Sequence, residues 1–310
     1  VVAQTTDAWE KELSKVVVET NDTVAKRIFY TGMYHAFLQP VLFNDVNNDY
    51  RGADRQVYSN APFKNYTVFS LWDTYRAAHP LYTILQPERV SDFVKSMLAI
   101  FDQKGCLPVW HLYGSDTYEM IGIQSVPVIA DAILKGDNTF NYEQAYNAMK
   151  QSMLSDYKGL NFVRENEYIP ADKEGESVAK GLEYALADWS VAQVAKKLGK
   201  EDDYRLFMER AGYYRHYWDP SVRFFRGKNA DGSWREVSHT QDGRYLVFAI
   251  EDGDESFCLI GSMKKSVSWL PIIGAGGAAV VVLLVVILLV HHRRKKKAVK
   301  SETPTVNETT

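Results

Sequence analysis

The sequence predicts an all-α fold, an array of helical hairpins that is followed by a short β-hairpin and a single transmembrane helix. The first observation behind this prediction is that apolar residues before residue 240 recur at spacings of three and four, whereas alternating strand patterns are almost absent there. The second observation is an uncharged run of 22 residues, WLPIIGAGGAAVVVLLVVILLV, which is long enough to cross a hydrocarbon core of about 30 Å as a helix. The predicted organisation is residues 1–240 as a helical domain, 241–268 as a β-hairpin or linker, 269–290 as the transmembrane helix and 291–310 as a basic tail.

Apolar periodicity and helix end signals define the helices of the first domain. Trp9 and Leu13 begin the pattern at a spacing of four residues. Pro87 lies at the first position of a helix, where its missing N–H costs nothing, and Gly105 ends that helix. The predicted helical segments are residues 6–38, with a second helix at 25–38, and residues 87–103, 122–135, 142–155, 176–198 and 202–218.

Residues 243–261 differ from the helical array that precedes them. They read GRYLVFAIEDGDESFCLIG, with two β-prone runs around the acidic residues 251–255. We predict a β-hairpin here, joining the helical domain to the transmembrane helix.

The charges on the two sides of residues 269–290 predict a type I membrane topology. Six Lys and Arg follow the span, whereas Lys264 and Lys265 precede it, so the positive-inside rule places the C-terminal tail in the cytosol and the N-terminal domain outside the cell or in a lumen. Asn21 and Asn65 lie in Asn-x-Thr patterns, which are N-glycosylation acceptors and fit that location. The chain begins VVAQTT without a leader, so we expect the given sequence to be processed or incomplete.

The charge balance of the N-terminal part argues against a nucleic-acid partner. Taking the six Lys and Arg and the two Glu of the tail from totals of 36 and 39 leaves 30 basic and 37 acidic residues, a net charge of −7. Neutralising phosphates requires a basic face, which this balance does not favour. The two cysteines, Cys106 and Cys258, imply no disulfide framework, and whether they pair is left open.

An acidic loop early in the chain resembles the start of a calcium-binding loop. Asp45, Asn47 and Asp49 alternate along it. Tyr50, however, stands where the turn glycine is required and Gln56 where the bidentate Glu is required. We interpret the loop as a polar turn and predict no metal ligand in it.

The run FSLWDTYR, residues 69–76, is the candidate binding stretch. An indole covers the apolar face of a sugar ring, and a carboxylate accepts hydrogen bonds from its hydroxyls, so Trp72 and Asp73 suggest a carbohydrate as the first substrate class. Aromatic residues make up 13% of the chain, which agrees with a sugar-binding cleft but also with helix packing. The alternative is that Trp72 is a core tryptophan and that Asp73 caps a helix.

Ordered motifs along the chain resemble glycoside hydrolase family 92, the calcium-dependent, exo-acting α-mannosidases. The resemblance covers about residues 7–236. The motifs that carry it are FSLWDTYR at 69–76, HPL at 79–81, QPER at 86–89, LPVW at 107–110, MIG at 120–122, SVPVIADA at 125–132, SV at 177–178, LEYA at 182–185, DW at 188–189 and DGSW at 231–234.

This resemblance implies a fold, a reaction and a cofactor. The fold of the family is a β-sandwich followed by an (α/α)6 barrel, and the helical domain here then corresponds to an incomplete (α/α)6 barrel. The reaction is inverting hydrolysis at a terminal α-mannose of a mannose-containing glycan, and calcium helps to bind the sugar. Trp72 and Asp73 match the pair that contacts the terminal mannose.

The chain also departs from the family pattern. The segment with the general-acid glutamate, the paired aspartates proposed as base and the calcium-binding segment are not found after Trp234, so we name no catalytic residue and no metal ligand. Within retained motifs, Asp116, Glu119 and Gln124 replace the usual Glu, Cys and His. We expect weak or no activity, and a chain that is unstable alone or needs a partner chain to complete the barrel.

Three hypotheses remain open at this point. The chain is a membrane-anchored α-mannosidase-like hydrolase, a non-catalytic mannose-binding ectodomain, or a product misjoined by splicing or gene prediction. The ordered motifs favour the first, the retained Trp72 and Asp73 favour the second, and the abrupt change after Trp234 favours the third.

Overall fold

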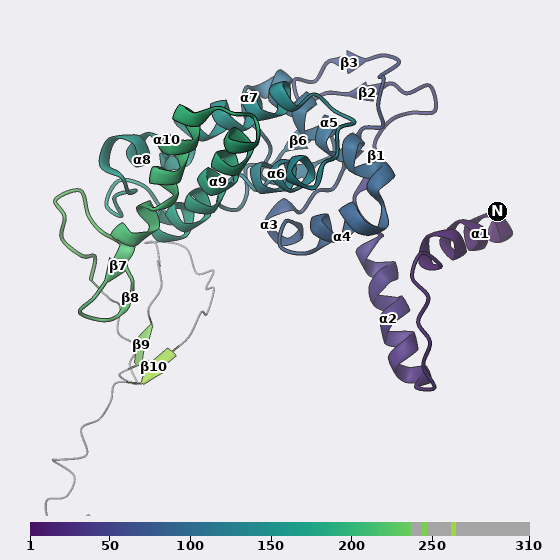
Figure 1. Cartoon of the computed structure of the whole chain (residues 1–310), viewed down its shortest axis with the longest axis horizontal. Coiled ribbons are helices and arrows are strands. Elements are labelled where there is room, and N and C mark those ends of the chain that lie inside the picture. Colours follow the sequence, from purple (N-terminus) through teal and green to yellow (C-terminus); the bar gives the residue numbers. More distant parts are fainter. Residues whose placement is uncertain (237–243, 247–261, 265–310) are drawn as a thin grey trace, which may run out of the picture. The chain divides into compact units, whose positions relative to one another are not determined.

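The structure is a computed structural model that describes residues 1–236, 244–246 and 262–264 (Figure 1). The described residues are mostly helical with short two-stranded sheets, which confirms the helical class predicted from the sequence. The α-helices are α1 (Val2–Leu13), α2 (Thr23–Ala36), α3 (Leu71–Thr74), α4 (Ala78–Leu85), α5 (Pro87–Lys104), α6 (Ser125–Lys135), α7 (Tyr142–Met153), α8 (Leu160–Asn166), α9 (Ser177–Lys197) and α10 (Glu201–Ala211). The strands are β1 (Val41–Leu42), β2 (Tyr50–Arg51), β3 (Val57–Tyr58), β4 (Tyr66–Thr67), β5 (His111–Leu112), β6 (Ser115–Asp116), β7 (Trp218–Asp219), β8 (Phe224–Phe225), β9 (Arg244–Leu246) and β10 (Ser262–Lys264).

Short-range chemistry sets several helix ends, and those of α5 and α6 at Gly105 and Gly136 lie where the sequence predicts them. Helix α5 begins at Pro87 and ends before Gly105, whose φ of 78° is the left-handed conformation that glycine adopts without a Cβ clash. Helix α6 ends in the same way before Gly136, at a φ of 92°. Asp22 caps α2 by accepting hydrogen bonds from the backbone N–H groups of Val24 and Ala25.

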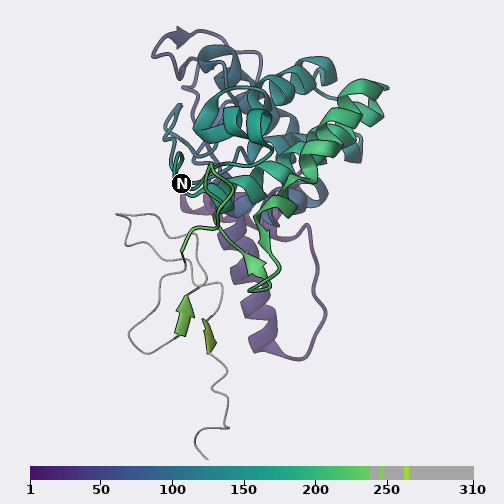
Figure 2. The same ribbon diagram turned by 90° about the vertical axis from the view of Figure 1, so that its left-hand side faces the viewer.

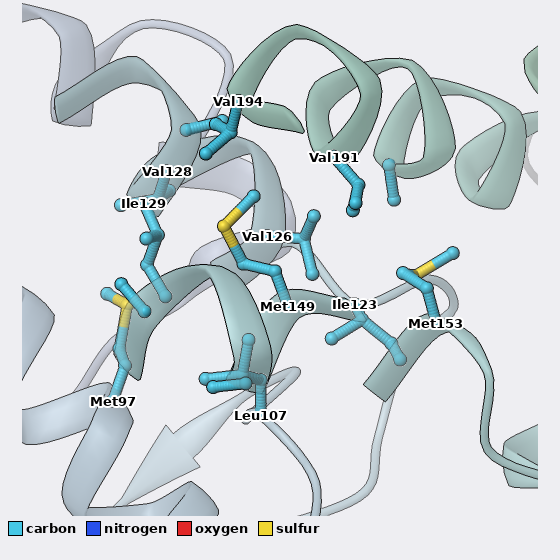
Figure 3. Packing of buried hydrophobic residues seen from close by; sticks show 14 of the residues in the cluster. Met97, Leu107, Ile123, Val126, Val128, Ile129, Met149, Met153, Val191 and Val194 are labelled. Atoms are coloured by element: carbon cyan, nitrogen blue, oxygen red, sulfur yellow. The ribbon is translucent and has the colours of Figure 1, made fainter. Parts of the chain in front are cut away.

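The hydrophobic core lies between helices α5, α6, α7 and α9. Figure 3 shows side chains from these helices and from the loops around them pointing toward one another. Burying one apolar side chain of this kind stabilises the folded state by about 1.5–3 kcal/mol. The labelled residues in that view are Met97, Leu107, Ile123, Val126, Val128, Ile129, Met149, Met153, Val191 and Val194.

Helix α9 is packed against several other helices. It contacts α6, α7 and α10 (Figures 1 and 2). Its Gly181 makes room for the buried ring of Tyr217, because a Cβ at residue 181 would lie 2.2 Å from Tyr217 Oη. A larger residue at this point would displace the ring, so a glycine in mid-helix has a packing reason here.

A buried ion pair joins α9 to α10. Arg210 Nε donates to Asp188 Oδ2 at 3.0 Å, and the two side chains are 3% and 1% exposed. Arg210 Nη2 also donates to the carbonyl of Met153 at 2.8 Å. Burial raises the pKa of Asp188 to about 7, although the guanidinium beside it opposes that rise.

Ion pairs attach α1 to the beginning of α5. Glu12 accepts from Arg89 Nη2 at 2.7 Å and from Gln86 Nε2 at 3.0 Å, and Lys15 Nζ lies 2.9 Å from Glu88 Oε1. The residues of α1 are all exposed or half-buried, so polar contacts rather than a buried apolar face hold this helix.

The predicted helix at 202–218 is too long at its C-terminal end. Helix α10 ends at Ala211, and a 3-10 turn at Tyr213–Tyr217 leads into β7. One reason is the following hairpin, in which β7 pairs with β8 and Asp219 accepts from Arg226 Nη1 at 2.6 Å. The other is tertiary, because Tyr217 Oη accepts from the backbone N–H of Ile169 at 2.8 Å.

Short elements were missed by the periodicity analysis. Helix α8 has seven residues and follows Gly159, whose φ is 89°. Strands β1 to β8 have two residues each, which is too short for an alternating pattern to be visible. The acidic loop interpreted as a polar turn lies just before β2, and Asp45 N donates to the carbonyl of Asp49 at 2.8 Å within it.

The last described residues are strands β9 and β10. They pair antiparallel, with Tyr245 opposite Met263, and form a unit separate from residues 1–236. The turn predicted at 251–255, the transmembrane span predicted at 269–290 and the tail lie outside the described residues. None of the helices that the structure describes is long and apolar enough to cross a membrane. Cys106 carries a free thiol, and Cys258 also lies outside the described residues.

Candidate functional site

The candidate binding stretch begins with a segment that is fixed in the core. Phe69 pairs with His111 through two backbone hydrogen bonds of 2.9 and 3.2 Å, and Phe69 and Leu71 are 1% and 0% exposed. Helix α3 starts at Leu71, so the next two residues turn outward. Trp72 is half-buried and Asp73 is exposed, which places an indole and a carboxylate at the surface of a rigid support.

The structure does not place these two residues as the alternative interpretation predicts. The N-cap of α3 is Ser70 and that of α4 is Ala77, so Asp73 caps neither helix. Asp73 instead accepts a hydrogen bond from Ser70 Oγ, which orients its carboxylate. Trp72 lies at the edge of the core rather than in it. The contact with a sugar that the sequence predicts for this pair stays a prediction.

The carboxylate of Glu183, on α9, collects the polar groups of this region. Its Oε1 accepts from Trp72 Nε1 at 3.2 Å and from Arg76 Nη2 at 3.3 Å. Its Oε2 accepts from Tyr75 Oη and from Gln124 Nε2, both at 3.1 Å. We call these five residues the Glu183 cluster.

Arg76 ties the cluster together on its outer side. Its guanidinium lies over the ring of Trp72 at 5.3 Å and over the ring of Tyr75 at 4.7 Å, distances at which a cation is attracted to an aromatic face. Arg76 Nε also donates to the carbonyl of Trp72 at 3.2 Å. Burial and the neighbouring Glu183 carboxylate raise the pKa of Tyr75 to about 12, so the phenol remains a hydrogen-bond donor.

Gly122 allows the cluster to close. Its φ is 81°, and a Cβ at this position would lie 2.0 Å from Gln124 Nε2 and 3.0 Å from Glu183 Cβ. Any side chain at residue 122 would push both partners away. The Met-Ile-Gly motif therefore has a steric purpose next to the candidate site.

Asp116 serves the loop that precedes the cluster. Its carboxylate accepts from the backbone N–H groups of Val109, Trp110 and Tyr118 at 2.9, 3.1 and 3.0 Å. Because both oxygens are occupied by backbone donors, Asp116 fixes the shape of the loop. We assign it no catalytic role.

Glu183 is the site residue that the sequence analysis missed as a partner of Trp72. The two residues are 111 positions apart, and a hydrogen bond between distant residues leaves no local pattern. The signal that could have indicated it is the LEYA motif at 182–185, which contains this glutamate.

No metal-ligand cluster is found among the described residues. They contain no group of three or more His, Cys, Asp or Glu side chains that could hold a metal ion. The acidic residues 251–255 lie outside the described part of the chain.

The chain is similar in sequence and in structure to known glycosidases. A sequence model described as the glycosyl hydrolase family 92 catalytic domain matches residues 1–266. A solved α-mannosidase of this family from Bacteroides thetaiotaomicron, in complex with mannoimidazole, is 47% identical with a TM-score of 0.73, over 75% of this chain and 31% of that protein. An inverting family 92 mannosidase from the same species is 31% identical with a TM-score of 0.70, over 76% of this chain and 33% of that protein.

A curated relative is more distant. It is an uncharacterized secreted glycosidase from Arthroderma benhamiae, 19% identical over 73% of this chain and 29% of the relative. The chain thus spans about a third of the length of the proteins that it matches. Its helical hairpins are consistent with the barrel-like α/α fold of these glycosidases. With more than half of its length matched by the catalytic-domain model, and with 47% identity to a solved member, the chain belongs to glycosyl hydrolase family 92.

Proposed function

We propose that this chain carries the part of an exo-acting, inverting α-mannosidase site that binds the terminal mannose of a mannose-containing glycan. The observation that carries the proposal is the placement of Trp72 and Asp73 at the start of α3, with the indole held by Glu183 and the carboxylate exposed. The complex of a 47% identical relative with mannoimidazole supports the same substrate class.

The two side chains would divide the recognition of the sugar. The indole of Trp72 would cover the apolar C–H face of the ring, and the Asp73 carboxylate would accept hydrogen bonds from two hydroxyls. The Ser70 hydroxyl already donates to Asp73, which holds the carboxylate in one orientation before the sugar arrives. Such preorganisation reduces the entropy lost on binding.

Hydrolysis with inversion requires more than this pair. One carboxylic acid protonates the leaving oxygen, and a second carboxylate about 6.5–9.5 Å away activates a water molecule. We assign neither group within residues 1–236, and we assign calcium, the family cofactor, no ligand there. We propose that these roles are supplied from outside residues 1–236.

The first test is the affinity of the full 310-residue chain for methyl α-mannoside, measured by titration calorimetry. Trp72→Ala and Asp73→Asn should each weaken binding by about ten-fold or more, because each removes a direct contact with the ring or its hydroxyls. Asp202→Asn is the matched control, since the side chain of Asp202 is 99% exposed on α10. Equal affinity in wild type and both site variants would refute the proposal.

A non-catalytic mannose-binding protein is the second candidate. The observation in its favour is that Trp72 and Asp73 are present while the sequence after Trp234 does not match the general-acid segment of the family. Release of mannose from an α-1,2-linked mannobiose in the presence of calcium, abolished by a chelator, would support the hydrolase. Binding without release would support the second candidate.

We further propose that residues 269–290 anchor the chain in a membrane with residues 1–268 outside the cytosol. The uncharged span and the six Lys and Arg after it support this orientation.

A further inference from the structure

We propose that Glu183 is a positioning residue that fixes the indole of Trp72 as a platform for the sugar. The inference rests on the proposed function, in which Trp72 contacts the sugar. It adds a role for a side chain on α9, far from Trp72 in sequence.

The first step of the argument is the convergence of donors on one carboxylate. Among the described residues, an indole N–H, a phenol, a guanidinium and a side-chain amide all donate to Glu183 within 3.1–3.3 Å. Hydrogen bonds to a charged acceptor are stronger than neutral ones, and the Glu183 side chain is only 13% exposed. The hydrogen bond from Trp72 to this carboxylate is therefore stronger than a bond to a neutral acceptor in water would be.

The second step concerns what the indole can still offer to a ligand. Its N–H is used by Glu183, so Trp72 cannot donate to a sugar hydroxyl. One of its faces lies under the guanidinium of Arg76, which is itself bound to Glu183. In the proposed complex the sugar would pack its apolar ring surface on the opposite face, and Asp73 would bind the hydroxyls.

The third step is rigidity. A sugar that packs on an aromatic ring loses affinity when the ring is free to rotate, because the ring must then be ordered on binding. Glu183 is anchored on α9, whose neighbours α6, α7 and α10 pack against it. Gly122 keeps space for Gln124 to reach the same carboxylate. The packing of α9 therefore fixes the orientation of the Trp72 ring through Glu183.

The test is Glu183→Gln in the full chain, followed by two measurements. With ¹⁵N-labelled tryptophan, the indole N–H signal of Trp72 should shift, while the signals of the other six tryptophans stay in place. Trp72→Phe identifies which signal belongs to residue 72. Affinity for methyl α-mannoside should fall by about ten-fold. A neutral amide is a weaker acceptor than a carboxylate, and its NH2 group would face donors of the cluster that it cannot accept from.

A double-mutant cycle separates positioning from general destabilisation. In the Trp72→Phe background there is no indole N–H to hold, so Glu183→Gln should change the affinity much less than it does in wild type. Glu209→Gln, the same chemical change at an exposed position of α10, should leave both the signal and the affinity unchanged. If Glu183→Gln does not fold, Glu183→Asp takes its place, since it keeps the charge but draws the carboxylate back by one methylene.

The outcomes distinguish this inference from the proposed function. Wild-type binding that Glu183→Gln leaves unchanged, or that falls equally in both backgrounds, would overturn the positioning role and leave the binding function intact. A wild-type chain that does not bind the mannoside would overturn the proposed function and this inference with it.

Discussion

His111 is a buried residue that the candidate site does not use directly. Its ring stacks on Phe69 at 5.7 Å, and Phe69 stacks in turn on His79 at 5.9 Å. Within the described part of the chain, neither ring nitrogen of His111 has a hydrogen-bond partner. Burial lowers the pKa of His111 to about 4 and that of His79 to about 3, so both rings are neutral in the folded protein at neutral pH.

The two histidines make the fold sensitive to acid. An unfolded histidine has a pKa of about 6.5, so between about pH 6.5 and pH 4 the unfolded chain binds a proton at His111 that the folded chain does not. The free energy of unfolding should therefore fall as the pH falls through this window, by roughly 1.4 kcal/mol per pH unit for each histidine. His111→Phe removes the contribution of one histidine, so the free energy of unfolding should depend on pH less steeply by roughly 1.4 kcal/mol per pH unit. Urea unfolding at several pH values measures this slope. Identical slopes in the two proteins would contradict the assignment.

At this scale, the sequence could predict Trp72 and Asp73 but not what holds them. The pair is a candidate because its two residues are adjacent and chemically distinctive, and its contact with a sugar stays a prediction. The bond from Trp72 to Glu183 crosses 111 positions, and it exists only after α9 has been placed against α3. The LEYA motif at 182–185 marks the glutamate, but no local pattern in a single sequence links it to Trp72.

Among the elements, the link between α9 and α10 depends on the buried pair of Asp188 and Arg210. Removing one partner leaves a charge uncompensated in the core, so Asp188→Ala should lower the free energy of unfolding by about 3–5 kcal/mol at pH 8, where the carboxylate is ionised. Denaturant unfolding followed by circular dichroism gives this value. The exposed pair of Asp202 and Arg205 has the same 3.0 Å separation, and Asp202→Ala should change little. Equal effects at both sites would show that burial does not set the cost.

Helix ends were predictable where the signal is local. Pro87, Gly105 and Gly136 act on the backbone of their own turn, and the structure follows them. The end of α10 was not predictable, because Tyr217 is drawn under Gly181 and Asp219 is bound by Arg226. Tertiary contacts override helix propensity in such places.

For the whole molecule, the proposed membrane anchor has a direct test. Val282→Arg together with Leu284→Arg places two charges at the centre of the proposed span, each costing about 2.5–3.5 kcal/mol for insertion. The wild-type chain should stay with the membrane pellet after alkaline carbonate extraction, and the double variant should move to the supernatant. Val306→Arg, in the tail, is the control. A wild-type chain released by carbonate would refute the anchor.

The helical class of the described residues was predicted from the sequence, but the arrangement of the helices was not. Helical periodicity and the ordered motifs gave an α-helical member of a mannosidase family, in agreement with the family match over residues 1–266. The order of packing around α9 was not predictable. It depends on which apolar faces meet, and many pairings of amphipathic helices satisfy the same pattern.

The central place of α9 has a consequence for the order in which the chain folds. Helix α10 follows α9 directly, whereas α6 is separated from α9 by α7 and α8. Contacts between neighbours in sequence form with a small loss of chain entropy, so the α9–α10 hairpin is expected to be structured early in the transition state, and α6 to dock later. Changes in the α9–α10 interface would then slow folding, whereas changes on α6 would mainly speed unfolding.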